Sequence, residues 1–290
     1  MKGLLYKGTT WNDYTDIYLR SYQKSDTDKE NWNSWELQYP DDYPSNDTWQ
    51  PMMDLIDFCS DNTTDEEFLA SYQDYFYADN LADYVVFTLA LNVGDNIYKN
   101  TFLSTVDITK GHQYLISPWD MDKSLGGDFD GKHLDITTHK NRYNERAPFN
   151  RLIANNLDGF SDKLEDIWTK HYSTLFAPDS IGRRLDRYAN LFTTSGAWDR
   201  ESDKWNDNPV PLKTQIAEEL EYVKDWYDKN YQYLCGKFGT TYETGGITGK
   251  KESVSHKGIH TLDGRKVHSA DRHRLEKGIY IVDGRKILVR

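Results

Sequence analysis

The sequence predicts an α+β fold that is mostly helical, with a small β-hairpin near its middle and a small β-rich tail at its C-terminal end. Apolar residues recur at helical spacing through much of 64–92 and 161–237. Two short runs of β-favouring residues, 100–106 and 113–117, interrupt this pattern and indicate the hairpin. An Asp-Gly pair that occurs twice after residue 257, each time between short β-favouring runs, indicates the tail.

The first helix signal is a capping box. Thr64 is followed three residues later by Glu67, which predicts a helix from 65 to about 75. An apolar period predicts a second helix over 80–91, which ends near a glycine. The first fifty residues are rich in aromatic residues, Asp and Asn and show no clear period. After the hairpin, the same helical period predicts three further helices, over 161–175, 179–192 and 213–237.

Charge and composition divide the chain into an acidic body and a basic tail. The 290 residues carry a formal net charge of −12. Residues 239–290 hold 11 Lys or Arg against 6 Asp or Glu, which leaves 24 basic and 41 acidic residues in the rest. We expect a body over 1–238, a flexible Gly/Thr-rich linker over 239–257 and a β-hairpin tail over 258–290, with strands at 278–282 and 285–289.

The composition excludes several classes of protein. The acidic net charge argues against nucleic acid as a partner. No window approaches the roughly 20 consecutive apolar residues of a transmembrane helix, and we expect no signal peptide in this chain. Cys59 and Cys235 are the only cysteines, which excludes a disulfide scaffold and a four-cysteine zinc site. These two thiols either pair or remain buried and free.

The most informative stretch is 91–127. A helix end is followed by Asp95 and, five residues later, by Asn100; the predicted hairpin comes next, and then an acidic turn with Asp120 and Asp122. Protein kinases arrange a catalytic Asp, a metal-binding Asn, two strands and a magnesium-binding Asp in this order. A hairpin places the two loops at its open end side by side, so these groups are expected in one site.

Each of these residue types suits phosphoryl transfer. That reaction needs positioning and charge neutralisation more than covalent chemistry. Mg²⁺ prefers carboxylate and amide oxygens and keeps several waters, so Asn100 with one or two aspartates suffices. A further carboxylate can accept the proton of the attacking hydroxyl group. A calcium-binding EF-hand loop beginning at Asp120 is disfavoured, because Leu125 and Gly131 stand where that loop needs glycine and glutamate.

Two neighbouring features are ambiguous. The segment Asp128-Phe129-Asp130-Gly131 superficially resembles a kinase Asp-Phe-Gly motif, but its second Asp breaks the pattern, and we interpret it as a loop next to the site. Three arginines, Arg142, Arg146 and Arg151, follow this loop. They could contact phosphate, although salt bridges within the acidic body are the more ordinary interpretation.

Several segments resemble the CotH-type spore-coat kinases. The segment Leu-Asn-Val-Gly-Asp-Asn-Ile-Tyr-Lys-Asn at 91–100 is similar to the family's loop, in which an Asp precedes a Lys-Asn pair. The segment Ser-Pro-Trp-Asp-Met-Asp-Lys-Ser-Leu-Gly at 117–126 is similar to its Pro-Trp-Asp-x-Asp-x-x-x-Gly block. Weaker similarities occur at 3–8, around Trp205 and at 226–227, so that the resemblance spans roughly 3–238.

The resemblance implies an atypical protein kinase-like fold that uses ATP and Mg²⁺, or Mn²⁺, to phosphorylate Ser on a protein substrate. It implies that Asp95 is the catalytic Asp and that Asn100 and Asp120 bind the nucleotide through the metal, with Asp120 as the principal metal ligand. Asp122 would assist either the metal or the loop geometry. A secreted or cell-surface location is also implied, and the basic tail resembles the C-terminal sorting tails of exported bacterial proteins.

The sequence departs from a kinase pattern before Asp95. We expect an upstream β-lobe with a glycine-rich phosphate cover and a strand-borne lysine. Only Lys7 stands in a β-like context there, and a surface role is its more ordinary interpretation. The sequence therefore predicts the C-terminal lobe of a kinase-like protein, with the N-lobe and signal peptide outside this chain and activity possibly lost.

Two non-catalytic alternatives remain open. The many Tyr and Trp residues suit a surface-binding or adhesion module with a protein or carbohydrate partner. A structural role in coat or surface assembly is also compatible with the same fold. Convergence of Asp95, Asn100 and Asp120 on one site is the observation that separates the kinase hypothesis from both.

Overall fold

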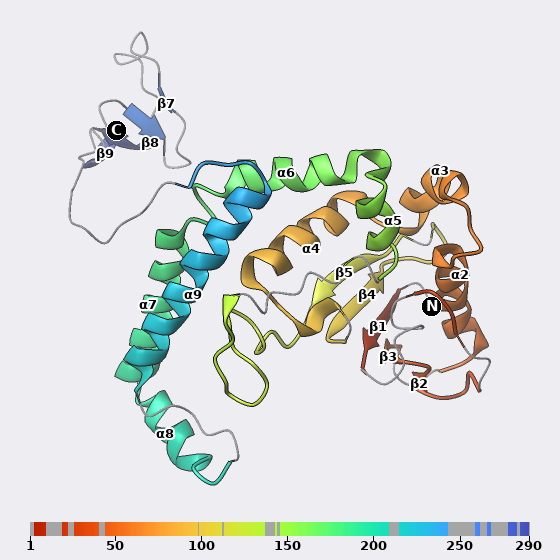
Figure 1. Ribbon diagram of the computed structural model, residues 1–290, viewed down its shortest axis with the longest axis horizontal. Coiled ribbons are helices and arrows are strands. Elements are labelled where there is room, and N and C mark those ends of the chain that lie inside the picture. The colour runs from red at the N-terminus through yellow and green to blue at the C-terminus, as the bar shows by residue number, and fades with distance from the viewer. Residues whose placement is uncertain are drawn as a thin grey trace. The chain divides into compact units, whose positions relative to one another are not determined.

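A computed structural model gives the fold of the chain (Figure 1). It separates into two compact units, residues 1–243 and 244–290. Several predicted features lie outside the described residues. They are most of the predicted linker (243–257 of 239–257), the first residues of the helix predicted over 213–237 and both Asp-Gly pairs of the tail. The residues that the structure describes are 3–9, 19–22, 26–40, 44–97, 99–111, 113–136, 143, 146–208, 215–242, 259–261, 266–267, 278–282 and 285–289.

A five-stranded antiparallel sheet lies at the centre of the larger unit, in the order β2-β3-β1-β4-β5. The predicted hairpin is confirmed as β4 and β5, with Thr101 opposite Pro118 at its open end. The sequence did not predict that three short strands from the first forty residues extend this hairpin into a sheet. The strands are β1 (Leu4–Gly8), β2 (Asn31–Trp32), β3 (Trp35–Tyr39), β4 (Thr101–Thr105) and β5 (Leu115–Pro118).

Helices cover this sheet and make up most of the larger unit. All five predicted helices are confirmed within a few residues, and α2, α5 and α8 are additional ones. The sequence concealed α2 because Pro51 lies inside it, where proline removes a backbone donor. The helices are α2 (Asn46–Cys59), α3 (Asp65–Tyr75), α4 (Ala78–Leu91), α5 (Phe149–Ala154), α6 (Phe160–His171), α7 (Pro178–Thr194), α8 (Ala197–Lys204) and α9 (Ile216–Lys237), with short 3₁₀ turns η1 (Asp95–Ile97) and η4 (Leu157–Gly159).

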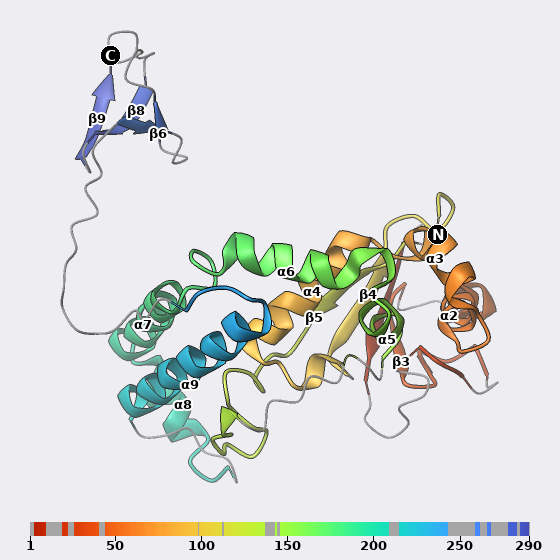
Figure 2. The same ribbon diagram turned by 45° about the horizontal axis from the view of Figure 1, so that its top comes forward.

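The central helix α4 connects the sheet to the other helices. It packs against β5 on one side and against α6 and α9 on the others, as Figures 1 and 2 both show. Asn230 of α9 is fully buried, and its side-chain amide donates to the carbonyl groups of Leu89 and Ala90 at the end of α4. The last carbonyl groups of a helix lack the usual i+4 amide partners, and the Leu89 carbonyl group also accepts from the Asn92 amide at 3.2 Å. The contact therefore fixes the point at which the chain leaves α4.

Large aromatic residues supply much of the core. Trp32, Trp35, Trp49 and Trp168 are almost completely buried. Tyr6 of β1 stacks on Trp49 of α2, with ring centroids 5.4 Å apart. A few large rings bury much apolar area, which explains how a chain with only 37% hydrophobic residues forms a sizeable core.

The two cysteines are buried and free, which decides between the alternatives that the sequence left open. Burial raises the pKa of the Cys59 thiol far above its usual range, so this thiol stays protonated and unreactive.

The smaller unit contains a four-stranded antiparallel sheet in the order β7-β6-β8-β9. The two predicted strands are confirmed as β8 and β9 and pair along their whole length, from Gly278 opposite Val289 to Val282 opposite Arg285. Across the described part of the chain, no helix combines the length and apolar character needed to span a bilayer. The strands are β6 (Ile259–Thr261), β7 (Lys266–Val267), β8 (Gly278–Val282) and β9 (Arg285–Val289).

Candidate active site

The open end of the β4–β5 hairpin brings two loops together. One loop, residues 92–100, connects α4 to β4, and the other, residues 118–127, follows β5. The Trp119 amide donates to the Asn100 carbonyl group at 2.9 Å, and the Gly94 amide donates to the Lys123 carbonyl group at 3.2 Å. The Asn100 amide donates to the Gly8 carbonyl group at 2.9 Å, which joins the end of β1 to the same place.

Two of the predicted site residues are in direct contact. The Asn100 side-chain nitrogen lies 3.4 Å from Asp120 Oδ2, although the two residues are twenty positions apart in the sequence. Asp95 begins the same loop as Asn100, and both are about 7% exposed, whereas Asp120 is exposed. Asp122 is also exposed, and its carboxylate accepts a hydrogen bond from the Lys123 amide. The two loops thus place Asp95, Asn100 and Asp120 at one end of the sheet. Asp122 lies at the exposed edge of this group.

Two lysines surround the Asp95 carboxylate, and the sequence analysis assigned neither of them to the site. Lys99 Nζ lies 3.4 Å from Asp95 Oδ2, and Lys123 Nζ lies 3.7 Å from Asp95 Oδ1. Lys123 also forms an ion pair with Asp128 at 3.0 Å. Asp95 Oδ1 is buried and accepts no hydrogen bond from the described residues. Their positions in the sequence could have indicated them, because Lys99 directly precedes Asn100 and Lys123 directly follows Asp122.

The backbone of both loops adopts left-handed conformations that non-glycine residues seldom take. Asn92, Asn100, Asp120 and Leu125 have φ between 49° and 54°. Asn92 ends α4 in this conformation, so the helix stop is this residue and not the nearby Gly94. Such residues cost about 1–3 kcal/mol each and cluster at functional sites, where the surrounding structure holds them in place.

A comparison against protein families covers the segments that form this site. A family model described as CotH kinase protein matches residues 3–234, which is well over half of the chain. The chain belongs to the CotH kinase family. A search of curated proteins found no match.

The loop that carries Asp95 in this CotH-family protein rests on buried polar side chains. Tyr84 of α4 donates through its hydroxyl group to the Asn96 carbonyl oxygen at 2.6 Å, and Thr101 donates to the same oxygen at 2.7 Å. The Asn96 amide donates to the carbonyl groups of Asn100 and Trp119 and so holds both loops together. Burial raises the pKa of Tyr84 to about 12, so its hydroxyl group remains a donor at neutral pH.

Arg146 supports this loop from the other side, and its environment corrects the sequence interpretation. The sequence analysis considered phosphate contact or a salt bridge for Arg142, Arg146 and Arg151. Arg151 forms an ion pair with Asp65 at 3.6 Å, and Arg142 lies outside the described residues. Arg146 is only 1% exposed, which excludes phosphate contact from solvent, and its Nη1 donates to the Ile97 carbonyl group at 2.8 Å. A second, longer contact of 3.4 Å joins Nη1 to the Asn96 carbonyl oxygen. Arg146 therefore positions the loop backbone from within the core, where it cannot reach a phosphate in solvent.

A third segment, residues 126–134, follows these two loops, borders the site and is held against α9 by hydrogen bonds. Tyr222 of α9 donates to the carbonyl groups of Gly126 and Leu134 at 2.8 and 2.9 Å. His133 stacks on Tyr222 with ring centroids 3.6 Å apart and contacts Glu219 at 2.9 Å. Because Asp128 contacts Lys123, this loop lies beside the Asp95 environment, as the sequence predicted for it.

Lys7 lies in a strand. The sequence analysis had noted only a β-like context for it. It lies in β1 directly opposite Glu36 of β3 and Phe102 of β4. Directly opposite residues share one face of a sheet. The Phe102 ring packs edge-to-face on Trp119, next to Asp120, with centroids 5.7 Å apart. The face that carries Lys7 and Glu36 therefore adjoins the candidate site.

Replacing Gly126 with alanine is expected to lower the free energy of unfolding by about 3 kcal/mol and to disturb the site. Gly126 has a φ of +84°, and an added Cβ would lie 2.5 Å from Trp226 and 2.6 Å from the Tyr222 hydroxyl group. Urea denaturation followed by tryptophan fluorescence measures the change.

The matched control is Gly236→Ala within α9. No atom lies within 4 Å of the Cβ that this substitution adds, and alanine favours a helix over glycine by about 1 kcal/mol. We expect Gly236→Ala to be neutral or stabilising. Equal destabilisation by both substitutions would contradict the packing of Gly126 against α9.

Proposed function

We propose that this CotH-family protein transfers the γ-phosphoryl group of ATP to serine hydroxyl groups of a protein. The observation that carries the proposal is the approach of Asn100 to Asp120 beside the buried Asp95, since sequence order alone does not bring these groups together. Membership of a kinase family supports the same reaction. Phosphoryl transfer depends mainly on positioning and charge stabilisation, and the site supplies charged groups on a hydrogen-bonded scaffold.

Asp95 is the candidate base. Its carboxylate would accept the proton of the serine hydroxyl group as that oxygen attacks the γ-phosphorus. Lys99 and Lys123 lie on either side of this carboxylate and would contact the oxygens of the transferred group. In the described structure the carboxylates of Asp95 and Asp128 hold the Lys123 ammonium group, so a phosphate would compete for a cation that is already positioned.

Asn100 and Asp120 are the candidate ligands of a Mg²⁺ or Mn²⁺ ion. Among the described residues, no three His, Cys, Asp or Glu side chains lie close enough to hold a metal by themselves. This fits Mg²⁺ in kinases, which takes one or two protein oxygens and completes its shell with waters and substrate phosphates. Asp120 and Asn100 carry a carboxylate and an amide oxygen on side chains that contact each other, and the exposed Asp122 is two residues further along the same loop. When bound, the ion neutralises phosphate charge.

The proposal is tested by incubating the protein with γ-labelled ATP and a serine-containing acceptor protein. We expect label to enter serine when Mg²⁺ or Mn²⁺ is present and to be absent when EDTA removes the metal. Phosphoamino-acid analysis of the product separates serine from threonine and tyrosine. ATP hydrolysis without transfer, or transfer that EDTA leaves unchanged, would contradict the proposal. No incorporation together with no binding of ATP would favour a non-catalytic surface or coat-assembly role.

A further inference from the structure

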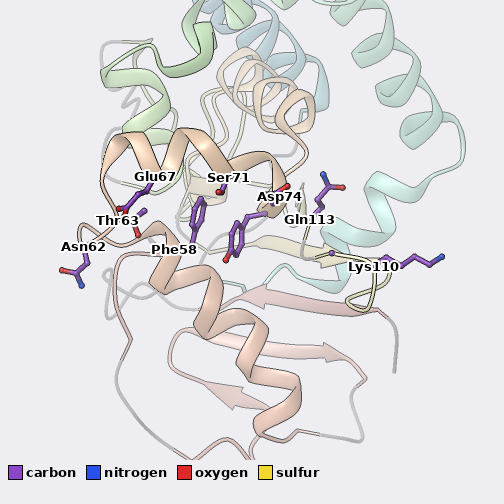
Figure 3. A pocket seen from close by; sticks show the side chains of 10 residues that line it. Phe58, Asn62, Thr63, Glu67, Ser71, Asp74, Lys110 and Gln113 are labelled. Carbon is purple, nitrogen blue, oxygen red and sulfur yellow. The ribbon is translucent and has the colours of Figure 1, made fainter.

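A groove of about 890 Å³ lies far from the candidate active site, between α2, α3 and the turn of the β4–β5 hairpin (Figure 3). Asn100 stands at the open end of this hairpin, whereas Lys110 stands at its turn. The five residues of β4 alone span roughly 17 Å. The residues that line the groove are Phe58, Asn62, Thr63, Glu67, Ser71, Asp74, Tyr75, Lys110, Gly111 and Gln113.

Hydrogen bonds fix the walls of this groove. Arg151 donates to the carbonyl groups of Ser60 and Thr63, which holds the loop between α2 and α3. On the opposite wall, the Gln113 side chain donates to the Gln73 carbonyl group at 2.7 Å. The Tyr114 amide donates to the Tyr75 carbonyl group at 2.7 Å. The groove is therefore preformed, and a ligand loses little affinity to the ordering of its walls.

The floor of the groove consists of stacked aromatic rings. Phe58 and Tyr75 are nearly parallel, with centroids 4.0 Å apart, and the other face of Phe58 stacks on Phe68 at 5.1 Å. Both faces of Phe58 are thus covered, so this ring presents its edge to the groove. A ring edge suits an aliphatic chain, whereas a sugar ring generally stacks on an open face.

One wall of the groove is anionic. Glu67, Ser71 and Asp74 follow one another at i, i+4 and i+7, so they share the face of α3 that lines the groove, as Figure 3 shows. Hydrogen bonds from Thr64 lower the pKa of Glu67, which keeps it ionised. The helical rise separates Glu67 from Asp74 by about 10 Å. Two cationic groups on an extended peptide match this spacing when they are three residues apart, about 9 Å in a polyproline II conformation.

We propose that this groove is a docking site for an extended segment of the acceptor protein that carries two lysine or arginine side chains three residues apart. The assignment to the acceptor rests on the proposed kinase function, whereas binding of the segment does not. The aliphatic stems of the two side chains lie over Phe58 and Tyr75, and their charged ends meet Glu67 and Asp74. A docked acceptor is held at the far end of the hairpin while its serine reaches the site beside Asp95.

The experiment measures binding of the fluorescein-labelled peptide Gly-Lys-Pro-Pro-Lys-Gly by fluorescence polarisation, without nucleotide. Glu67→Gln removes a charge but keeps a capping box, because glutamine serves that role as well as glutamate. We expect Glu67→Gln and Asp74→Asn each to weaken binding about two- to fivefold, and the double variant about tenfold or more. Glu66→Gln is the matched control, since it changes the same charge on the same helix outside the groove. It should bind as the unaltered protein does.

Several outcomes would overturn the proposal. The first is unchanged binding by the double variant, and the second is an equal loss in Glu66→Gln, which would indicate general attraction to an acidic protein. A third is equal affinity for a peptide with glutamine in place of both lysines, and a fourth is binding of chitohexaose but not of the peptide. Asp120→Ala separates this proposal from the kinase function: it should bind the peptide normally even if phosphate transfer is lost or never observed.

Discussion

Replacing Asp120 with alanine is expected to lower phosphate transfer to protein by about a thousandfold or more. Asp120 is the exposed carboxylate that approaches Asn100, and the two are the proposed metal ligands. Without this carboxylate, the metal would lose its ligand on the loop after β5. The phosphate charges that the metal would neutralise would then remain unbalanced. The measurement is the rate of label transfer from γ-labelled ATP at saturating Mg²⁺.

Two further variants test whether the loss comes from the carboxylate itself. Asp120 has a φ of +53°, a conformation that Asn tolerates much better than Ala. Asp120→Asn therefore keeps the loop geometry while it removes the charge, and we expect it to lose nearly as much activity. Asp130→Ala, which removes a half-buried carboxylate paired with Lys132 in the neighbouring loop, should retain most activity. Normal transfer by Asp120→Ala would refute the site.

Replacing Arg146 with methionine is expected to lower the free energy of unfolding by about 3 kcal/mol, or the melting temperature by about 6–12 °C. The substitution preserves the bulk of the side chain but leaves the buried Ile97 carbonyl group without its donor. A buried acceptor that loses its partner costs the full desolvation penalty. Because all nine tryptophans precede residue 244, tryptophan fluorescence reports the unfolding of the larger unit alone.

The matched control for this prediction is Arg20→Met. Arg20 contacts the Asp61 carboxylate at 2.8 Å, but both side chains are substantially exposed. Exposed ion pairs contribute roughly 0–1 kcal/mol. A similar loss of stability in both variants would contradict a buried supporting role for Arg146. We also expect Arg146→Met to reduce phosphate transfer, since the loop that it supports carries Asp95.

Parts of the fold could be predicted because their signals are local. The capping box of Thr64 and Glu67 marks the start of α3 within four residues of sequence. The period of α9 and the β-favouring runs of β4 and β5 are also contained in short windows. The strands β1 to β3 escaped prediction because the aromatic, Asp- and Asn-rich segment that contains them shows no clear period, and their place in the sheet depends on pairing with one another and with β4.

The candidate site shows the same division. Asp95, Asn100, Asp120 and Asp122 could be selected by residue type and order around a predicted hairpin. Lys123 was missed because only the return of the chain after β5 places it at Asp95. Arg146 was misread because its partner carbonyl group lies 49 positions earlier, and nothing in its own neighbourhood indicates burial.

The amino-acid sequence alone determined the family of this protein, through a resemblance that the family match confirms, and it suggested candidate site residues: an Asp and an Asn before a hairpin and an acidic turn after it. Only the tertiary structure decided which groups meet, how the Asp95 loop is supported and where a separate groove forms. The physical reason is the separation along the sequence over which each kind of interaction acts. Caps, turns and hydrophobic periods act over a few residues, whereas the contacts of Arg146 and Asn230 join segments about 50 and 140 residues apart.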